Sequence, residues 1–230
     1  MKQHSSVLTL DSRNRVNVGL PTNCQFALQD TVMASRFELS NFQFANNLFN
    51  IQTGSNRLHI SGVLAATSTP LFWTASAYIT DLNTQLKTYY VTVSDVVTLD
   101  TSNNKLTWVL PSGSISVTGS TMNRVLGLLG SETGSFTSTL FLVGPLQLGI
   151  QSPTLSCLSY NSNGRTDAVL GVIPVNSGFL EVQYYDPDRD WQLKFEPRVS
   201  FNLLNIIITD SRTGLLAQGL GEWCACFVVY

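Results

Sequence analysis

The sequence predicts an all-β protein: an antiparallel β-sandwich of the single jelly-roll type, with two facing sheets of about eight strands and one short helix near residues 76–87. Three observations support this fold class. Short apolar runs recur along the chain, and turn-forming residues separate them at intervals of about 8 to 15 residues. One segment alone has helical periodicity. The chain has 230 residues, a length that suits a single all-β domain.

Strands are expected where apolar and polar residues alternate, or where an apolar run lies between turn-forming residues. They cover residues 6–10, 24–28, 33–44, 57–61, 89–98, 105–110, 115–117, 140–143, 146–150, 155–160, 168–175, 180–185, 191–195, 198–209 and 223–230. The small, polar segment at 131–138 is expected to be a loop. No internal repeat or shift in composition divides the chain. We therefore expect an N-terminal arm, residues 1–15, followed by one domain over residues 16–230.

The expected helix begins near Thr74 or Ser76, either of which can cap its first turn, and ends near residue 87. Ile79, Leu82 and Leu86 follow one another at the spacing of a single helical face, and no proline or glycine interrupts them. We expect this helix to pack across one end of a sheet, in a structural role.

The rest of the expected fold is organised around the C-terminal segment. Residues 223–230 carry no charge and are apolar on both faces, so they would be insoluble unless they lay inside a sheet. We expect a central strand there, which forms a closing hairpin with the strand at 198–209 through a turn at Asp210 and Gly214. The apolar alternation of that preceding strand slips at Leu203, which predicts a β-bulge or burial of both faces.

The composition bears on the class of partner. Charged residues make up only 12% of the chain, roughly half the usual share for a soluble domain, whereas apolar residues make up 43%. Such low charge fits a surface that is largely covered by other subunits, and it also occurs in secreted β-proteins. Lys and Arg number 13 against 15 Asp and Glu, which gives a net charge of −2. Because proteins that wrap nucleic acid usually have a basic excess, we expect no direct contact with nucleic acid.

The four cysteines, Cys24, Cys157, Cys224 and Cys226, are expected to be free thiols buried in the core. Cys224 and Cys226 lie two residues apart in a strand, on the same face, where they are badly placed to bridge each other. The sequence has no N-x-S/T glycosylation site, and its first residues form neither a signal peptide nor a membrane span. These features favour a protein made and used in a reducing compartment.

Residues with catalytic chemistry are few. A Ser-His-Asp triad would depend on His59, which strand alternation directs toward solvent. Gly127, Gly130 and Gly134 are not followed by the Gly-Lys-Ser/Thr of a phosphate cradle. We therefore expect no enzyme activity, no cofactor and no metal site. A hydrolase built on His59 remains an alternative, which loss of esterase activity in His59→Ala would favour.

Two further groups of residues have binding chemistry. Asp186, Asp188 and Asp190 alternate as Ca²⁺ ligands do, but the glycine and glutamate of an EF-hand loop are absent, so a turn is expected. The second group consists of the four tryptophans, Trp73, Trp108, Trp191 and Trp223. They would either stack on sugars or anchor the core and interfaces. A carbohydrate- or receptor-binding module is therefore the second hypothesis, which glycan binding lost in Trp191→Ala would favour.

The order of short motifs along the chain resembles a known family. The motifs are LDSRNR at 10–15, YITDLNTQL at 78–86, NKLTW at 104–108, RVLG at 124–127, DSRTG at 210–214 and Trp223 before the last strand. In this order and spacing they are similar to the single jelly-roll penton or minor capsid proteins of large DNA viruses of eukaryotes, their virophages and Polinton-type elements. The resemblance covers nearly the whole chain.

This resemblance implies a structural protein of the virion, synthesised and assembled in the cytoplasm or nucleus of the host. Five copies would form a homopentamer that seals the icosahedral five-fold vertex, between trimers of the major capsid protein. Minor capsid or spike proteins would be further partners. Such a role requires a rigid fold and broad, weakly charged sides, and no catalytic residue or cofactor.

Contacts between subunits are expected at the arm and at one tryptophan. Residues 7–10 alternate well enough to add to the sheet edge of a neighbour. In an extended chain Arg13 and Arg15 would point to one side, suited to carboxylates of a partner. In the alternative reading, the arm is the first strand of its own subunit. Trp191 is the third candidate residue for the subunit interface.

Overall fold

The computed structural model of the protein describes residues 5–116, 118–156, 167–186, 192–211 and 213–230. These residues form one α-helix, α1 (Ala75–Tyr90), and two short 3₁₀ helices, η1 (Ser12–Asn14) and η2 (Thr53–Ser55). They also form twelve strands: β1 (Ser6–Asp11), β2 (Asn23–Ala45), β3 (Arg57–Ile60), β4 (Val63–Thr67), β5 (Val97–Asp100), β6 (Lys105–Ser116), β7 (Thr133–Thr139), β8 (Gln147–Ser156), β9 (Asp167–Pro174), β10 (Val182–Tyr185), β11 (Gln192–Asp210) and β12 (Trp223–Val229). The predicted class, antiparallel β with one helix, is confirmed.

The chain forms two compact units. The terminal unit contains residues Met1–Leu48 and Pro145–Tyr230, and the inserted unit contains Phe49–Gly144. Each unit has its own antiparallel sheet and its own cluster of buried apolar side chains. The sequence predicted one domain over 16–230. The boundary leaves no compositional trace because both units are apolar, weakly charged β-structure, so the division arises from which strands pair and which side chains are buried together.

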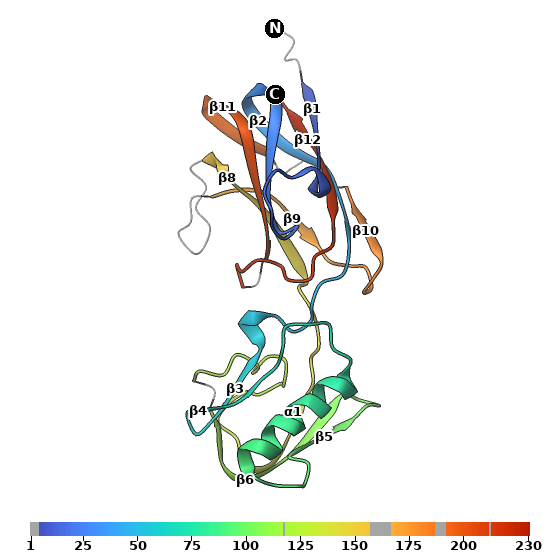
Figure 1. The fold of residues 1–230 in the computed structure, drawn as a ribbon, viewed down its shortest axis with the longest axis vertical. Coiled ribbons are helices and arrows are strands. Elements are labelled where there is room, and N and C mark those ends of the chain that lie inside the picture. Colours follow the sequence, from blue (N-terminus) through green and yellow to red (C-terminus); the bar gives the residue numbers. More distant parts are fainter. Residues whose placement is uncertain (1–4, 117, 157–166, 187–191, 212) are drawn as a thin grey trace. The chain divides into compact units, whose positions relative to one another are not determined.

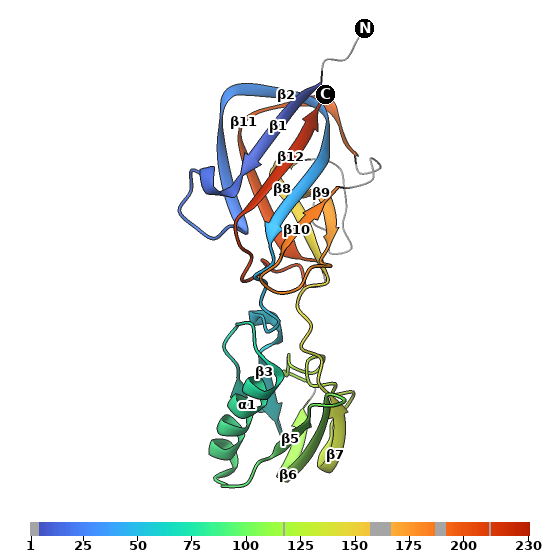
Figure 2. The same cartoon turned by 90° about the vertical axis from the view of Figure 1, so that its right-hand side faces the viewer.

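The terminal unit is a β-sandwich of the kind expected for a jelly roll. Its seven-stranded sheet has the order β1-β12-β2-β11-β8-β9, and β10 also pairs with β2. The long strand β2 pairs with β12 through its C-terminal half and mainly with β11 through its N-terminal half. The sheet therefore forms two layers, with β1, β12 and β10 on one side and β8 and β11 on the other (Figures 1 and 2). Buried side chains from both layers make up the core between them.

The predicted central strand at the C-terminus is confirmed. β12 lies between β1 and β2, and its residues are alternately buried and half-buried. The closing hairpin is wrong, however, because β11 and β12 are separated by β2. The turn itself forms: the Gly214 N–H donates to the Asp210 carbonyl at 2.8 Å, and Gly214 has a φ of 69°. The predicted bulge is also confirmed, since the register of β11 against β2 shifts between Phe201 and Leu203.

The inserted unit contains the second sheet, of order β4-β3-β6-β5, with β7 beside β6. The predicted helix is confirmed as α1, and the Thr74 hydroxyl caps it by accepting from the Ala77 N–H at 3.3 Å. The buried Asn83 side chain joins the helix to the strand region: its oxygen accepts from the Val96 and Val97 N–H groups, both at 3.0 Å, and its amide donates to the Val97 carbonyl at 2.6 Å.

Some expected elements of the inserted unit differ from the structure. The strand over 89–98 is wrong, because the helix continues to Tyr90 and a strand begins only at Val97. The loop over 131–138 is wrong as well, because β7 pairs with β6 there. Threonine and serine make up five of the seven residues of β7, TGSFTST, and most of them face solvent. The strand therefore lacks the alternation of apolar and polar residues that predicts a half-buried strand. The strand forms because its backbone pairs with β6, and most of its side chains stay exposed.

The C-cap of α1 leads to the first experiment. Val91 has a φ of 54°, in the left-handed region that β-branched residues disfavour, and its side chain is 93% exposed. We expect Val91→Gly to raise the free energy of unfolding, by up to about 1 kcal/mol, because it removes backbone strain and almost no packing. Val93→Gly is the control, since Val93 is also 93% exposed but lacks a positive φ. Urea unfolding that shows equal or lower stability for Val91→Gly would contradict this account.

Candidate functional site

The candidate site is the outer face of the layer formed by β1, β12, β2 and β10. The strand registers place Asp11, Cys224, Gln43 and Tyr184 in one row across this layer. Their side chains point away from the core, because the buried residues of β12 are the alternate ones. A group of charged residues, Asp11, Arg13, Arg15 and Glu222, lies where β1 ends and β12 begins.

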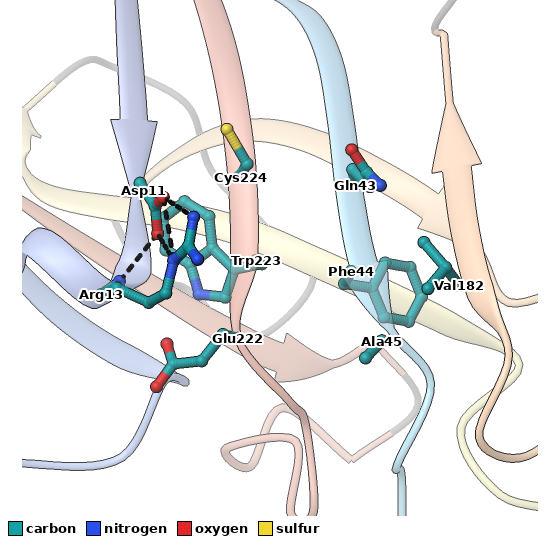
Figure 3. Close-up of a pocket in the computed structure, with 9 residues that line it drawn as sticks. All are labelled: Asp11, Arg13, Gln43, Phe44, Ala45, Val182, Glu222, Trp223 and Cys224. Carbon is teal, nitrogen blue, oxygen red and sulfur yellow. Dashed lines mark hydrogen bonds and ion pairs between the residues drawn. The ribbon is translucent and has the colours of Figure 1, made fainter.

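A pocket of about 260 Å³ opens on this face. Figure 3 shows Asp11, Arg13 and Glu222 on one side of the pocket, with Gln43 and Val182 across β12 from them. Phe44, Ala45, Trp223 and Cys224 complete the lining. The pocket therefore has a charged side, supplied by the N-terminal segment and by Glu222 just before β12, and a mostly apolar side, supplied by β2 and β10.

The charged side is held in place by contacts between the two ends of the chain. Arg15 Nη1 lies 3.0 Å and 3.1 Å from the two carboxylate oxygens of Glu222, and it donates to the Ser12 carbonyl at 2.6 Å. The Ser12 hydroxyl donates to Glu222 and accepts from the Trp223 N–H at 2.8 Å. Ser12 is fully buried. These bonds attach the turn after β1 firmly to the start of β12.

Arg13 has a different environment. Its guanidinium forms a fork on Asp11, with Nε 2.9 Å and 3.0 Å from the two carboxylate oxygens, and its side chain is 73% exposed. The hydrogen bonds from Arg13 hold the pKa of Asp11 below its usual value, so the carboxylate is ionised at neutral pH. The pair is neutral overall and faces solvent, which leaves the guanidinium edge accessible to a further acceptor.

The thiol in this pocket is a poor nucleophile. Burial raises the pKa of Cys224, so the thiol stays protonated at neutral pH. Cys224 and Cys226 lie on the same outer face, as predicted, but both are half-buried rather than buried in the core. Cys24 is fully buried, and burial raises its pKa to about 11. These three cysteines are free thiols, and Cys157 lies outside the described residues.

The predicted arm, residues 1–15, contains the strand β1. Residues 6–11 form β1, which pairs with β12 along its whole length. The premise of an extended chain around Arg13 and Arg15 is wrong, because residues 12–14 form η1 and both arginines contact carboxylates of the same chain. Trp191 lies outside the described residues. The role of Arg13 and Arg15 between subunits remains a proposal.

Deletion of residues 1–15 tests whether this segment belongs to the domain. The deletion removes β1, the buried Ser12 and the ion pair of Arg15 with Glu222, so we expect the melting temperature to fall by at least about 5 °C. Arg13→Ala is the control, because it removes only an exposed ion pair and should change the melting temperature by about 1–2 °C at most. An unchanged melting temperature on deletion would instead identify the segment as an arm that serves assembly.

The tryptophans of the described residues do not form a sugar-binding face. Trp108 is fully buried in the inserted unit and Trp223 is 2% exposed in the terminal unit, where it stacks on Phe42 with ring centroids 5.5 Å apart. Trp73 is half-buried, and its indole N–H donates to the Thr69 carbonyl at 2.9 Å. These residues are anchors of two separate cores.

The other candidate residues have structural surroundings. His59 is half-buried beside Gly119, and its Nδ1 is buried without a hydrogen-bond partner among the described residues. Gly127, of the glycine-rich turn, packs against the backbone of Thr139, where a side chain would not fit. Asp186 follows β10, and Asp188 and Asp190 lie outside the described residues.

The described part of the chain has neither a candidate metal centre nor a candidate membrane-spanning helix. No three His, Cys, Asp or Glu side chains lie together there in a way that could hold a metal ion. Within the same ranges, no helix has the length and apolar character that crossing a membrane requires.

Comparisons with known proteins give one kind of match. No protein-family model and no curated protein matches this sequence. Among solved structures, the chain is similar to the crystal structure of selenomethionine-labelled mavirus penton protein. The match covers 98% of this chain and 99% of that chain, with 11% sequence identity and a TM-score of 0.49.

Proposed function

We propose that this chain is a penton-type capsid protein of a virion. Five copies would form a homopentamer that seals the five-fold vertex of an icosahedral shell, between trimers of the major capsid protein. The order of motifs in the sequence supports this role, since it resembles that of single jelly-roll capsid proteins. Assembly would take place in the cytoplasm or nucleus of the host, with minor capsid or spike proteins as further partners.

The observation that carries the proposal is a set of large apolar side chains that are exposed on the terminal unit. Val7, Leu180, Val182 and Tyr184 are between 63% and 70% exposed, and Val18 in the loop after η1 is fully exposed. Apolar side chains that share one face of a protein commonly mark a contact with another subunit, and Val7, Val182 and Tyr184 lie on the same outer face of the layer. The low share of charged residues in the whole chain, 12%, agrees with such a role.

Native mass spectrometry of the full-length protein over a range of concentrations tests this proposal. We expect a pentamer, and electron-microscopy class averages of the same sample should show rings with five-fold symmetry. A stable dimer or trimer would contradict the proposal, because neither closes a five-fold vertex.

A further inference from the structure

The terminal unit has two sheet edges that match each other. Within the described residues, β1 pairs with β12 alone and β10 pairs with β2 alone, so the layer β1-β12-β2-β10 ends in an open edge on each side. Val7 is 69% exposed at one edge, and Val182 and Tyr184 are 63% and 64% exposed at the other. Neither strand contains the lysine or proline that usually protects an open edge from pairing with another chain.

Backbone groups at both edges are oriented for pairing. The Asn46 N–H donates to the Glu181 carbonyl at 2.8 Å, so the backbone of Glu181 faces β2. In an antiparallel pair every second residue directs its N–H and C=O groups to the partner strand, so those of Val182 and Tyr184 point away from β2. At the other edge, the Trp223 N–H points toward Ser12 on the β1 side. By the same alternation, the backbone N–H and C=O groups of Val7, Thr9 and Asp11 in β1 point away from β12. The free donors and acceptors therefore belong, at both edges, to residues whose side chains lie on the outer face.

Strand directions and charges agree with this match. In the layer β1-β12-β2-β10 each strand is antiparallel to the next, so β1 and β10 run in opposite directions. β10 of one copy can therefore lie antiparallel to β1 of the next copy, with the outer faces of both layers on the same side. The exposed Arg13 follows β1, and the exposed Glu181 precedes β10. Antiparallel pairing brings these two opposite charges to the same end of the new strand pair.

We propose that β10 of one subunit pairs with β1 of the next, so that the outer layers of neighbouring copies join into a continuous antiparallel sheet. Thr9 would lie opposite Tyr184 and Asp11 opposite Val182, which places Glu181 beside the open edge of the Arg13 guanidinium. The contact uses two different surfaces of each copy, so it is head-to-tail and can close into a ring. This inference rests on the proposed homopentamer and identifies the surfaces that form it.

Charge reversal tests the contact. We expect Arg13→Glu and Glu181→Arg each to raise the protein concentration needed for half-maximal assembly by at least about tenfold, because each puts like charges together. The double variant Arg13→Glu/Glu181→Arg should restore assembly to within about threefold of the wild type, because it restores an opposite-charge pair. Arg57→Glu, which reverses an exposed charge on β3, is the control and should assemble normally. Thermal melting of each variant monitors the fold.

A second measurement addresses the backbone. Tyr184→Pro removes an N–H that points to the open edge and leaves the bonds of β10 to β2 in place, so we expect a folded protein that does not assemble. A wild-type pentamer that persists in both single reversals and in Tyr184→Pro would overturn this inference and leave the proposed function standing. A wild-type dimer formed through two β1 strands would overturn both.

Discussion

Removal of residues 224–230 should leave no soluble, folded protein. These residues make up nearly all of β12, which pairs with both β1 and β2. Ala225, Phe227 and Val229 are at most 4% exposed, and the Phe227 ring lies 4.8 Å from that of Phe37. Loss of the strand therefore opens the middle of a layer, exposes the apolar core, removes the partner of β1 and leaves one side of β2 unpaired.

The size of this effect follows from the buried area. Burial of a large apolar side chain contributes about 1.5–3 kcal/mol, and a domain has about 5–15 kcal/mol of total stability. Two such side chains and two rows of backbone hydrogen bonds together approach that total. The deletion also removes the Tyr230 carbonyl, which accepts from the Ser35 N–H and hydroxyl at 2.7 Å and 2.9 Å.

Soluble expression and cooperative thermal melting measure this outcome. Cys226→Ser is the matched control, because Cys226 belongs to the same strand but lies half-buried on its outer face. We expect this variant to remain soluble and to melt within a few degrees of the wild type. A truncated protein that stays soluble and melts cooperatively would show that β12 is not a central strand.

Trp108→Ala should destabilise the inserted unit by about 3–5 kcal/mol, the range for removal of a buried aromatic side chain. Trp108 is fully buried, and its ring stacks on Phe136 with centroids 5.6 Å apart and an angle of 9° between the planes. Its indole N–H donates to the Ser138 hydroxyl at 3.0 Å. The substitution therefore creates a cavity, ends a ring contact and leaves Ser138 without its donor.

Urea unfolding followed by far-ultraviolet circular dichroism measures this loss. Val109→Ala is the matched control, since Val109 is the next residue of β6 but is 54% exposed on the opposite face. We expect that control to cost less than about 1 kcal/mol. Equal losses in the two variants would show that Trp108 is not an anchor of this core.

Local pattern was enough to predict several elements. The helical spacing of Ile79, Leu82 and Leu86 predicted α1, because one face of a helix must be apolar to be buried. The absence of charge from residue 223 onward predicted a central strand, because an apolar chain end needs partners on both sides. The slip of the apolar alternation at Leu203 predicted a bulge, because a strand can keep the same face buried across such a slip only if it has an extra residue there.

Those local patterns did not predict which distant segments pair with each other. Arg15 and Glu222 are 207 residues apart, and nothing in the neighbourhood of either residue indicates the other. The same holds for β1 beside β12, for β7 beside β6, and for the separation of β11 from β12 by β2. Local patterns also did not reveal the pocket, because its lining comes from segments that are far apart along the chain, near residues 11–13, 43–45, 182 and 222–224.

The sequence by itself determined most of the extended segments, the place of the helix and the low share of charged residues, because these depend on residue type and local periodicity. Tertiary structure alone decided the division into two units and the positions of Trp73, Trp108 and Trp223. A buried face has the same pattern whichever partner buries it. Trp108 and Trp223 belong to different cores because β6 pairs within the inserted unit and β12 within the terminal unit.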